Sequence, residues 1–218
     1  MALTATANLK TRVTVIKTLE MKGCYVLSHN PNKVNIYYEV APKTDIESVL
    51  CPIVSQVSLK KRKTDRHIIF CQMYRDTTVL YEALMLQLAE KDLLLSDDNV
   101  RICEKFTGCT SPAMKKNILE SFTQQDGLVR IVVATVAFGM GLDSPNVRHI
   151  LHWGPPEDLE QYVQETGRGG RDGAVTKCIL YFSPKDLGPK HHVSAGMKMY
   201  CENTMECRRV LLMRECYG

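Results

Sequence analysis

The chain has 218 residues, of which 44% are hydrophobic and 24% charged, and its formal net charge is +4. These proportions are ordinary for a globular protein of one or two domains. No apolar run approaches the ~20 residues of a membrane-spanning helix, and the N-terminus lacks the pattern of a secretory signal. We therefore do not expect a membrane protein. The nine cysteines are odd in number, so we do not expect a disulfide-rich secreted protein either.

The predicted elements alternate between helices and short apolar strands. Helices are indicated by apolar residues at helical spacing, and strands by short β-branched or aromatic runs. In chain order we expect a helix over 9–21, a strand over 35–40, a helix over 45–58, a polar basic loop over 59–66, a strand over 67–71, a helix over 77–91, a loop over 96–99, a strand over 100–106, a helix over 111–122, strands over 129–135 and 148–153, a helix from 158, a strand over 175–182 and a helix over 197–216.

Two of these helices begin with recognisable capping residues. Ser111 precedes a proline, which is favoured in the first turn of a helix. Asp158 is followed three residues later by Gln161, at the spacing of a capping box. Strands that alternate with helices predict an α/β fold with a parallel sheet and helices on both faces. In such sheets, ligands bind beyond the carboxyl ends of the strands.

A glycine turn follows the strongest predicted strand. Residues 138–141 read Phe-Gly-Met-Gly, and glycines allow a backbone to approach a phosphate or a sugar where a Cβ would clash. Asp143 could accept hydrogen bonds from ribose hydroxyls. Taken alone, the glycines are more often a plain tight turn, and the carboxylate is more often a turn or capping group.

Two arginines, Arg168 and Arg171, stand three residues apart. On a helix end they would point the same way and could grip one phosphate, because a guanidinium is planar, stays charged and binds phosphate bidentately. An isolated pair of this kind is more often a solvated basic turn. The same holds for the basic run at 60–63, which could also contact phosphates.

Several kinds of site have no sequence signal. The cysteines at 201, 207 and 216 contain no Cys-x-x-Cys pair, so no complete metal site is predicted within this chain. The sequence also has no Gly-x-x-x-x-Gly-Lys-Ser/Thr loop to cradle phosphates and no Asp-Glu-x-His box to hold magnesium. The chain is therefore not expected to complete a nucleoside triphosphate site by itself.

Taken together, the motifs resemble those of the RecQ family of DNA helicases, in the second RecA-like motor domain. Residues 133–143 are similar to motif V of that family, and residues 162–173 to motif VI. The strand at 67–71 is similar to motif IV, and residues 3–7 are similar to motif III, which closes the first motor domain. Their order and spacing agree across nearly the whole chain.

The resemblance implies an overall organisation and a function. It implies a RecA-like helicase C-terminal domain over 41–190, preceded over 1–40 by the tail of a first motor domain and a linker. A truncated, helical zinc-binding subdomain would begin over 191–218. The chain would be the C-terminal motor half of an ATP-dependent 3′-to-5′ DNA helicase. Its partners would be single-stranded DNA, a duplex junction and the missing first motor domain, with no membrane, in the nucleus or, in a prokaryote, the cytoplasm.

The same resemblance implies ligands and residue roles. ATP and magnesium would be shared with the missing first domain, and zinc would be bound only with a complete downstream subdomain, to which Cys207 would contribute the first ligand. Arg171 would be the arginine finger and Arg168 its companion, facing the open edge where the glycine-bearing strand ends. The implied nucleotide contacts are Asp143, Gly141 and Gln164, the last also coupling the two domains. The implied DNA contacts are Thr135, Phe138 and Gly139, and the implied coupling residues of the first domain are Thr4 and Thr6.

The chain departs from the family pattern at a few places. The usual Tyr-His-Ala-Gly run is replaced by Lys-Phe-Thr-Gly at 105–108, and the segment 92–103 is longer than is typical. The alanine usual between the motif VI arginines is Gly169, which should loosen that turn. The departure at 105–108 and the missing first motor half favour an alternative function, a non-catalytic module that binds nucleic acid or a partner helicase.

Overall fold

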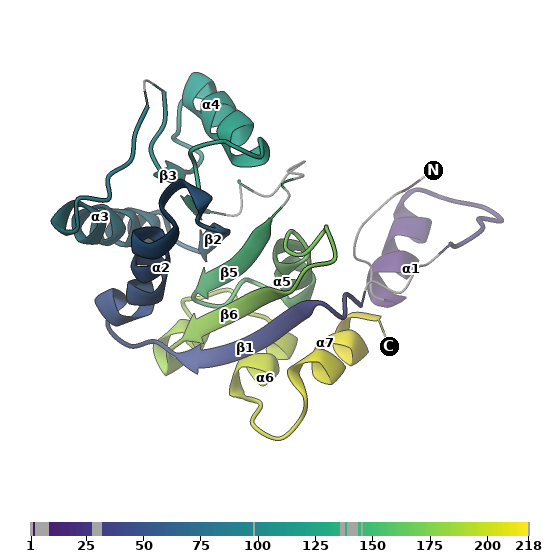
Figure 1. The fold of residues 1–218 in the computed structure, drawn as a ribbon. Helices are drawn as coiled ribbons and strands as arrows, with labels where there is room; N and C mark the ends of the chain where they lie inside the picture. The colour runs from purple at the N-terminus through teal and green to yellow at the C-terminus, as the bar shows by residue number, and fades with distance from the viewer. Residues whose placement is uncertain are drawn as a thin grey trace.

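The computed structural model describes residues 2, 9–27, 32–97, 99–135, 138, 144 and 146–217. Within them, parallel strands form one sheet in the order β1-β6-β5-β2-β4-β3 (Figure 1). The strands are β1 (Ile36–Pro42), β2 (Arg66–Cys71), β3 (Cys103–Phe106), β4 (Ile131–Ala134), β5 (Val147–Trp153) and β6 (Thr176–Phe182).

Helices cover both faces of this sheet. One face carries α2 and α3, whereas α4, α5, α6 and α7 lie on the other. The helices are α1 (Leu9–Thr18), α2 (Ile46–Lys60), α3 (Tyr74–Glu90), α4 (Pro112–Thr123), α5 (Leu159–Thr166), α6 (Ala195–Glu202) and α7 (Arg208–Tyr217), with short 3₁₀ turns η1 (Lys61–Lys63) and η3 (Pro184–Leu187). The predicted α/β fold with a parallel sheet between helices is confirmed.

The core of the described residues falls into two clusters. The larger joins β2, β3, β4 and β5 to α2, α3 and α4, and its strand residues are almost all fully buried. The smaller lies under β6 and is made by α5, α6 and α7. Among the described residues, no helix is both long and apolar enough to cross a membrane.

Three predicted boundaries differ from the structure. The predicted boundary at residue 41 falls inside β1, whose backbone pairs with β6 from Ile36 onward. The predicted loop over 59–66 is wrong at both ends, since α2 runs to Lys60 and Arg66 is the fully buried first residue of β2. The single helix predicted over 197–216 is two helices, because the Asn203 side chain accepts hydrogen bonds from the backbone N–H groups of Met205 and Glu206 and so ends α6.

The parallel arrangement gives the sheet two different edges. All strands begin at one edge, called here the amino edge, and end at the other, the carboxyl edge. Because α5 follows β5 and precedes the parallel strand β6, it carries the chain from the carboxyl edge back to the amino edge. The segment after α5 is therefore delivered to the side where the strands start.

Candidate functional site

The helix α5 is positioned by its first turn and by a buried hydrogen bond between His152 and Glu165. Asp158 accepts a hydrogen bond from the backbone N–H of Gln161 (2.8 Å), so the predicted cap is confirmed. The Gln161 side chain accepts from the backbone N–H of Glu157 (3.2 Å), one residue before the cap. The reciprocal bond of a capping box is thus present but displaced by one residue.

Both motif arginines follow α5 rather than lying on its last turn. The helix ends at Thr166, and residues 167–174 form a bent segment called here the arginine turn. The backbone N–H of Gly170 donates to the carbonyl oxygen of Val147 (3.3 Å), the first residue of β5. The arginine turn therefore lies at the amino edge of the sheet.

This location contradicts one expectation from the sequence. The arginines were expected to face the edge where the glycine-bearing strand ends, but Thr135 follows β4 at the carboxyl edge. Among the described residues, the two motifs thus lie at opposite edges of the sheet. The reason is topological, because a helix between parallel strands must return the chain to the edge where the next strand begins.

The two arginines differ in exposure. Arg168 is 7% exposed, and its Nε has no hydrogen-bond partner among the described residues. Burial and the nearby Arg171 lower the pKa of Arg168, while Glu165 opposes this shift. Arg171 itself is exposed. The turn thus places an accessible guanidinium beside a buried one, and their mutual repulsion would be relieved by an anion.

An ion pair fixes the far side of the arginine turn. The Arg148 guanidinium, in β5, donates to both carboxylate oxygens of Asp172, through Nη1 at 2.9 Å and through Nη2. Arg148 also donates to Oδ1 of Asn146 (2.9 Å). The hydrogen bonds from Arg148 lower the pKa of Asp172 to about 2. Asp172 is therefore held by Arg148, which fixes this part of the arginine turn to β5.

Gly169 does not loosen the turn. A Cβ at this position would lie 2.4 Å from Cγ2 of Thr176, and the Thr176 hydroxyl is held by a hydrogen bond to the carbonyl oxygen of Val147 (2.7 Å). The prediction of a looser turn is therefore wrong, because the missing Cβ is what lets the turn pack tightly against the start of β6.

Sequence reasoning missed a buried pair that anchors α5 to the sheet. His152 Nε2, in β5, lies 2.7 Å from Oε2 of Glu165, and the two side chains are 0% and 3% exposed. The other Glu165 oxygen accepts from Nε2 of Gln161 (2.9 Å). Glu165 stands inside the motif VI segment, which was the available signal, but its partner could be identified only once α5 was placed on β5.

The remaining predicted residues fall into three groups. Gln164 is exposed on α5 and Thr135 is partly exposed at the carboxyl edge. Phe138 is 1% exposed and packs edge-on against Phe106 and Phe122, with ring centres 4.9 and 5.6 Å apart. The Phe138 ring belongs to the core, and the predicted contact of this residue with DNA stays a prediction. The predicted residues outside the described part of the chain are Gly139, Gly141, Asp143, Thr4 and Thr6.

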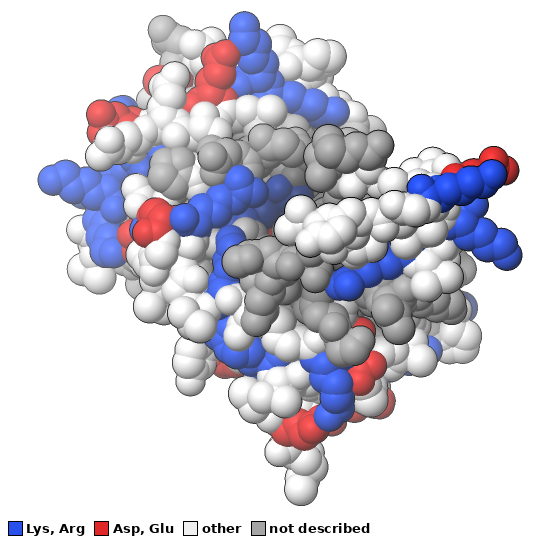
Figure 2. All heavy atoms as spheres, turned by 90° about the vertical axis from the view of Figure 1, so that its right-hand side faces the viewer, with Lys and Arg blue, Asp and Glu red and all other residues white. Residues whose placement is uncertain are grey.

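Basic side chains outnumber acidic ones on the face at the amino edge. Figure 2 views the molecule from the side on which β1 begins and shows more Lys and Arg than Asp and Glu, with the two kinds interspersed. Such a surface favours anionic ligands. In the described part of the chain, no group of three or more His, Cys, Asp or Glu side chains is arranged to hold a metal ion.

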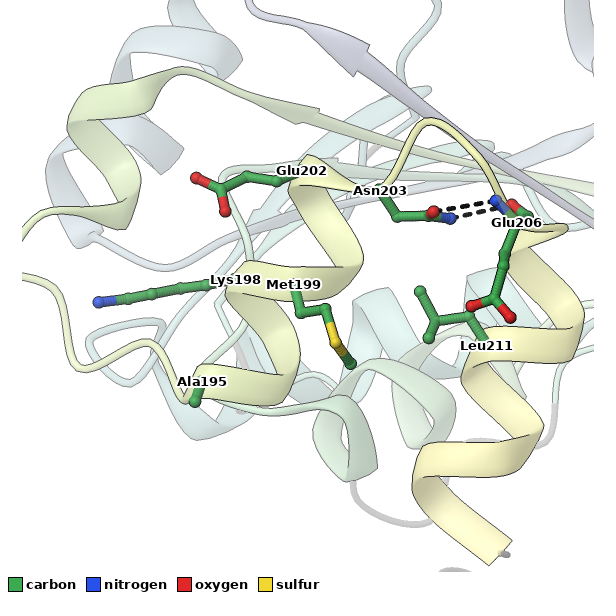
Figure 3. A pocket seen from close by; sticks show the side chains of 7 residues that line it. All are labelled: Ala195, Lys198, Met199, Glu202, Asn203, Glu206 and Leu211. Atoms are coloured by element: carbon green, nitrogen blue, oxygen red, sulfur yellow. Dashed lines mark hydrogen bonds between the residues drawn. The ribbon is translucent and has the colours of Figure 1, made fainter.

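A groove lies elsewhere, between α6 and α7. Its volume is about 450 Å³, and its lining residues are Ala195, Lys198, Met199, Glu202, Asn203, Glu206 and Leu211. Figure 3 shows Met199 pointing between the two helices, whereas Lys198 and Glu202 extend away from α7. None of the predicted site residues lines this groove.

Comparisons with known proteins identify the family of this chain and several relatives. The family described as "Helicase conserved C-terminal domain" matches residues 47–173. The "ATP-dependent DNA helicase hus2/rqh1" of Schizosaccharomyces pombe is 33% identical over 226 residues, which cover 96% of this chain and 16% of that protein. The "RecQ-like DNA helicase BLM" of Xenopus laevis is 30% identical, covering 98% of this chain and 16% of that protein. The chain therefore spans about a sixth of the length of these relatives.

A solved structure supports the fold. That of S. cerevisiae Dbp5 bound to RNA and ADP BeF3 superposes with a TM-score of 0.64 and 17% sequence identity, covering 93% of this chain and 49% of that chain. At this identity, the similarity establishes the RecA-like architecture alone.

Proposed function

Because the chain belongs to the helicase conserved C-terminal domain family and resembles RecQ-family helicases over nearly its whole length, we propose that it is the second motor half of an ATP-dependent DNA helicase. Translocation in the 3′-to-5′ direction is part of the proposal. So is a location in the nucleus, or in the cytoplasm of a prokaryote. The first motor half would supply the phosphate loop and the magnesium ligands, which this sequence lacks.

One observation carries the proposal, namely the pair of guanidinium groups in the arginine turn. Arg168 is buried beside Arg171, and its Nε has no partner among the described residues, which suits a site completed by an anion. When bound between the two halves, ATP supplies the phosphoryl group that is transferred. Arg171 would stabilise the negative charge that develops on the phosphoryl group, and the buried Arg168 would add to this stabilisation.

In this proposal, the two edges of the sheet contact different ligands. Nucleotide contact is assigned to the amino edge, where the arginine turn lies. DNA contact is assigned to the carboxyl edge, beginning at Thr135, with the strand held mainly through its phosphates. Zinc would enter only with a complete downstream subdomain.

A hybrid helicase tests the proposal. In it, this chain replaces the matching segment of the S. pombe relative, which restores a first motor half. Arg171→Ala is expected to lower ATP turnover by about 10³-fold or more, with DNA affinity changed less than about 3-fold. The matched control is Arg214→Ala, since Arg214 is an exposed arginine whose guanidinium is occupied by Glu206. The isolated chain should hydrolyse no ATP.

The alternative function is an outcome of the same experiment. Near-normal turnover in the Arg171→Ala hybrid would remove the arginine finger assignment. Weak, salt-sensitive binding of single-stranded DNA by the isolated chain, unaffected by nucleotide, would then favour a non-catalytic binding module.

A further inference from the structure

The segment that leads into β1 binds the arginine turn, although the two are far apart in the chain. Lys33 Nζ donates to the carbonyl oxygens of Gly167 (2.7 Å) and Gly169 (3.3 Å), from a position 134 residues before Gly167. The α5 sequence contains no Lys or Arg of its own. Lys33 therefore supplies the cation that the carbonyl end of a helix favours, and its bonds fall on either side of Arg168.

Asn35 makes the second set of bonds to the turn. Its Nδ2 donates to the carbonyl oxygens of Gly170 and Ala174, each at 2.8 Å. Gly170 has a φ of +59°, and a Cβ there would lie 2.3 Å from Asn35 Nδ2. The turn and the segment thus interlock, because the glycine leaves the space that the asparagine amide occupies.

Arg209, at the start of α7, holds this segment from the opposite side. Its guanidinium donates to Oδ1 of Asn32 (2.8 Å), to the carbonyl oxygen of Lys33 (2.6 Å) and to that of Ile36. It also lies 5.5 Å from the centre of the Tyr38 ring. A continuous series of contacts therefore runs from α7 through residues 32–36, called here the brace, to the arginine turn.

The simplest alternative is that the brace only stabilises the fold. The geometry is more specific than that, because Lys33 and Asn35 together bind four carbonyl oxygens of the turn, which flank both arginines. Burial lowers the pKa of Lys33, and the positive charge of Arg171 lowers it further.

We propose that Lys33 and Asn35 are positioning residues that set the placement of Arg168 and Arg171, and that Arg209 keeps them in position. The catalytic consequence rests on the proposed function. The effect on the arginine turn does not, so the two can be tested separately.

The first test uses the chain as it is, by NMR of the arginine Nε–Hε groups. Lys33→Ala and Asn35→Asp are each expected to raise the hydrogen-exchange rate of Arg168 Hε by about 10-fold or more while the chain stays folded. Lys33→Arg, which retains a cation, should restore most of the protection. Lys115→Ala is the matched control, because Lys115 donates to the Gly108 carbonyl (3.1 Å) outside the turn. Exchange within about 2-fold of the unmodified chain in both variants would overturn the proposal.

A pair of substitutions tests the role of α7 in the same spectra. Arg209→Ala should also raise the exchange rate of Arg168 Hε. Combined with Lys33→Ala it should add little, because both residues act through the brace. Fully additive effects would overturn the assignment of Arg209.

The second test uses the hybrid helicase. Lys33→Ala is expected to lower kcat by about 10- to 100-fold, with KM for ATP within about 3-fold, and to have almost no effect when Arg171 is already alanine. An unchanged kcat despite faster Arg168 exchange would overturn the catalytic role of the brace. Normal turnover of the Arg171→Ala hybrid would instead overturn the proposed function and leave the structural result standing.

Discussion

The two edges of the sheet are built in different ways. At the amino edge, several buried polar side chains donate hydrogen bonds to backbone carbonyl oxygens, whereas at the carboxyl edge aromatic rings make contacts. The buried polar residues of the amino edge are Thr64, Arg66, His67, Arg130, Arg168 and Thr176. At the carboxyl edge, Phe106 packs on Phe138, and Trp153 lies under the Lys43 ammonium at 4.9 Å. The placement of the arginine turn thus depends on directional bonds, which tolerate substitution less well than apolar packing.

The pair Arg66 and Arg130 illustrates this difference. Arg66 donates to the carbonyl oxygen of Gln124, and Arg130 donates to that of Gln125 (3.2 Å), just beyond the end of α4. The last turn of α4 has no basic residue of its own. Two neighbouring strands therefore supply the cations for this helix end, as Lys33 does for α5. The ends of α4 and α5 at the amino edge are thus stabilised in the same way.

The largest expected effect comes from Glu165, which links α5 to the sheet between the two edges. Glu165→Ala leaves His152 and Gln161 without their acceptor in a buried site, so the free energy of unfolding should fall by about 3 kcal/mol. Urea denaturation measures this. Glu39→Ala is the control, because the Glu39–Lys177 pair (2.8 Å) has side chains 43% and 45% exposed and should contribute less than about 1 kcal/mol. Equal losses of unfolding free energy in Glu165→Ala and Glu39→Ala would show that the His152–Glu165 pair does not anchor α5.

A smaller effect is expected from Gly169→Ala, which tests how tightly the arginine turn is packed. The added Cβ meets Cγ2 of Thr176 at 2.4 Å, and such overpacking costs about 1–3 kcal/mol. Thr176→Ser removes the Cγ2 methyl and keeps the hydroxyl for Val147. The double variant should therefore lose less unfolding free energy than the two single variants lose together. In a double-mutant cycle the difference should be about 1 kcal/mol or more. Strict additivity would contradict the close contact.

The smallest effect concerns pH and the buried histidine of the amino edge. Burial, His149 and Lys60 hold the pKa of His67 well below its ordinary value, and its ring stacks on that of His149 at 4.5 Å. Above pH ~6.5 both the folded and unfolded states keep this ring neutral. Below it the unfolded state binds a proton that the folded state excludes. The free energy of unfolding should therefore fall by about 1 kcal/mol between pH 7.5 and 5.5 on account of His67.

His67→Gln provides the comparison for this pH dependence. The variant keeps an amide that can bond to Oε1 of Gln56, which lies 2.6 Å from His67 Nε2, but it does not titrate. Chemical denaturation at a series of pH values should give a flatter curve for the variant. Identical slopes would mean that the pKa of His67 is the same in the folded and unfolded states.

Much of the architecture was predictable because its signals are local. The alternation of strands and helices follows from hydrophobic periodicity, and the caps Ser111 and Asp158 were identified from residue type and spacing. Asn203 is a residue type that often ends a helix, so it carried a local signal too. The single helix predicted over 197–216 was wrong because this signal was overlooked. The loop predicted over 59–66 was wrong at Arg66, because the partner of this side chain, the end of α4, lies far away in the sequence.

By itself, the sequence determined the α/β class, the order of the elements and the pair of arginines in motif VI, since periodicity, capping and motif spacing act over a few residues. Only the tertiary structure decided that the arginine turn lies at the amino edge, that Gly169 packs against Thr176, and that Lys33 and Asn35 bind the turn. These contacts join residues that are separated in the chain and become neighbours only when α5 returns the chain to the start of β6.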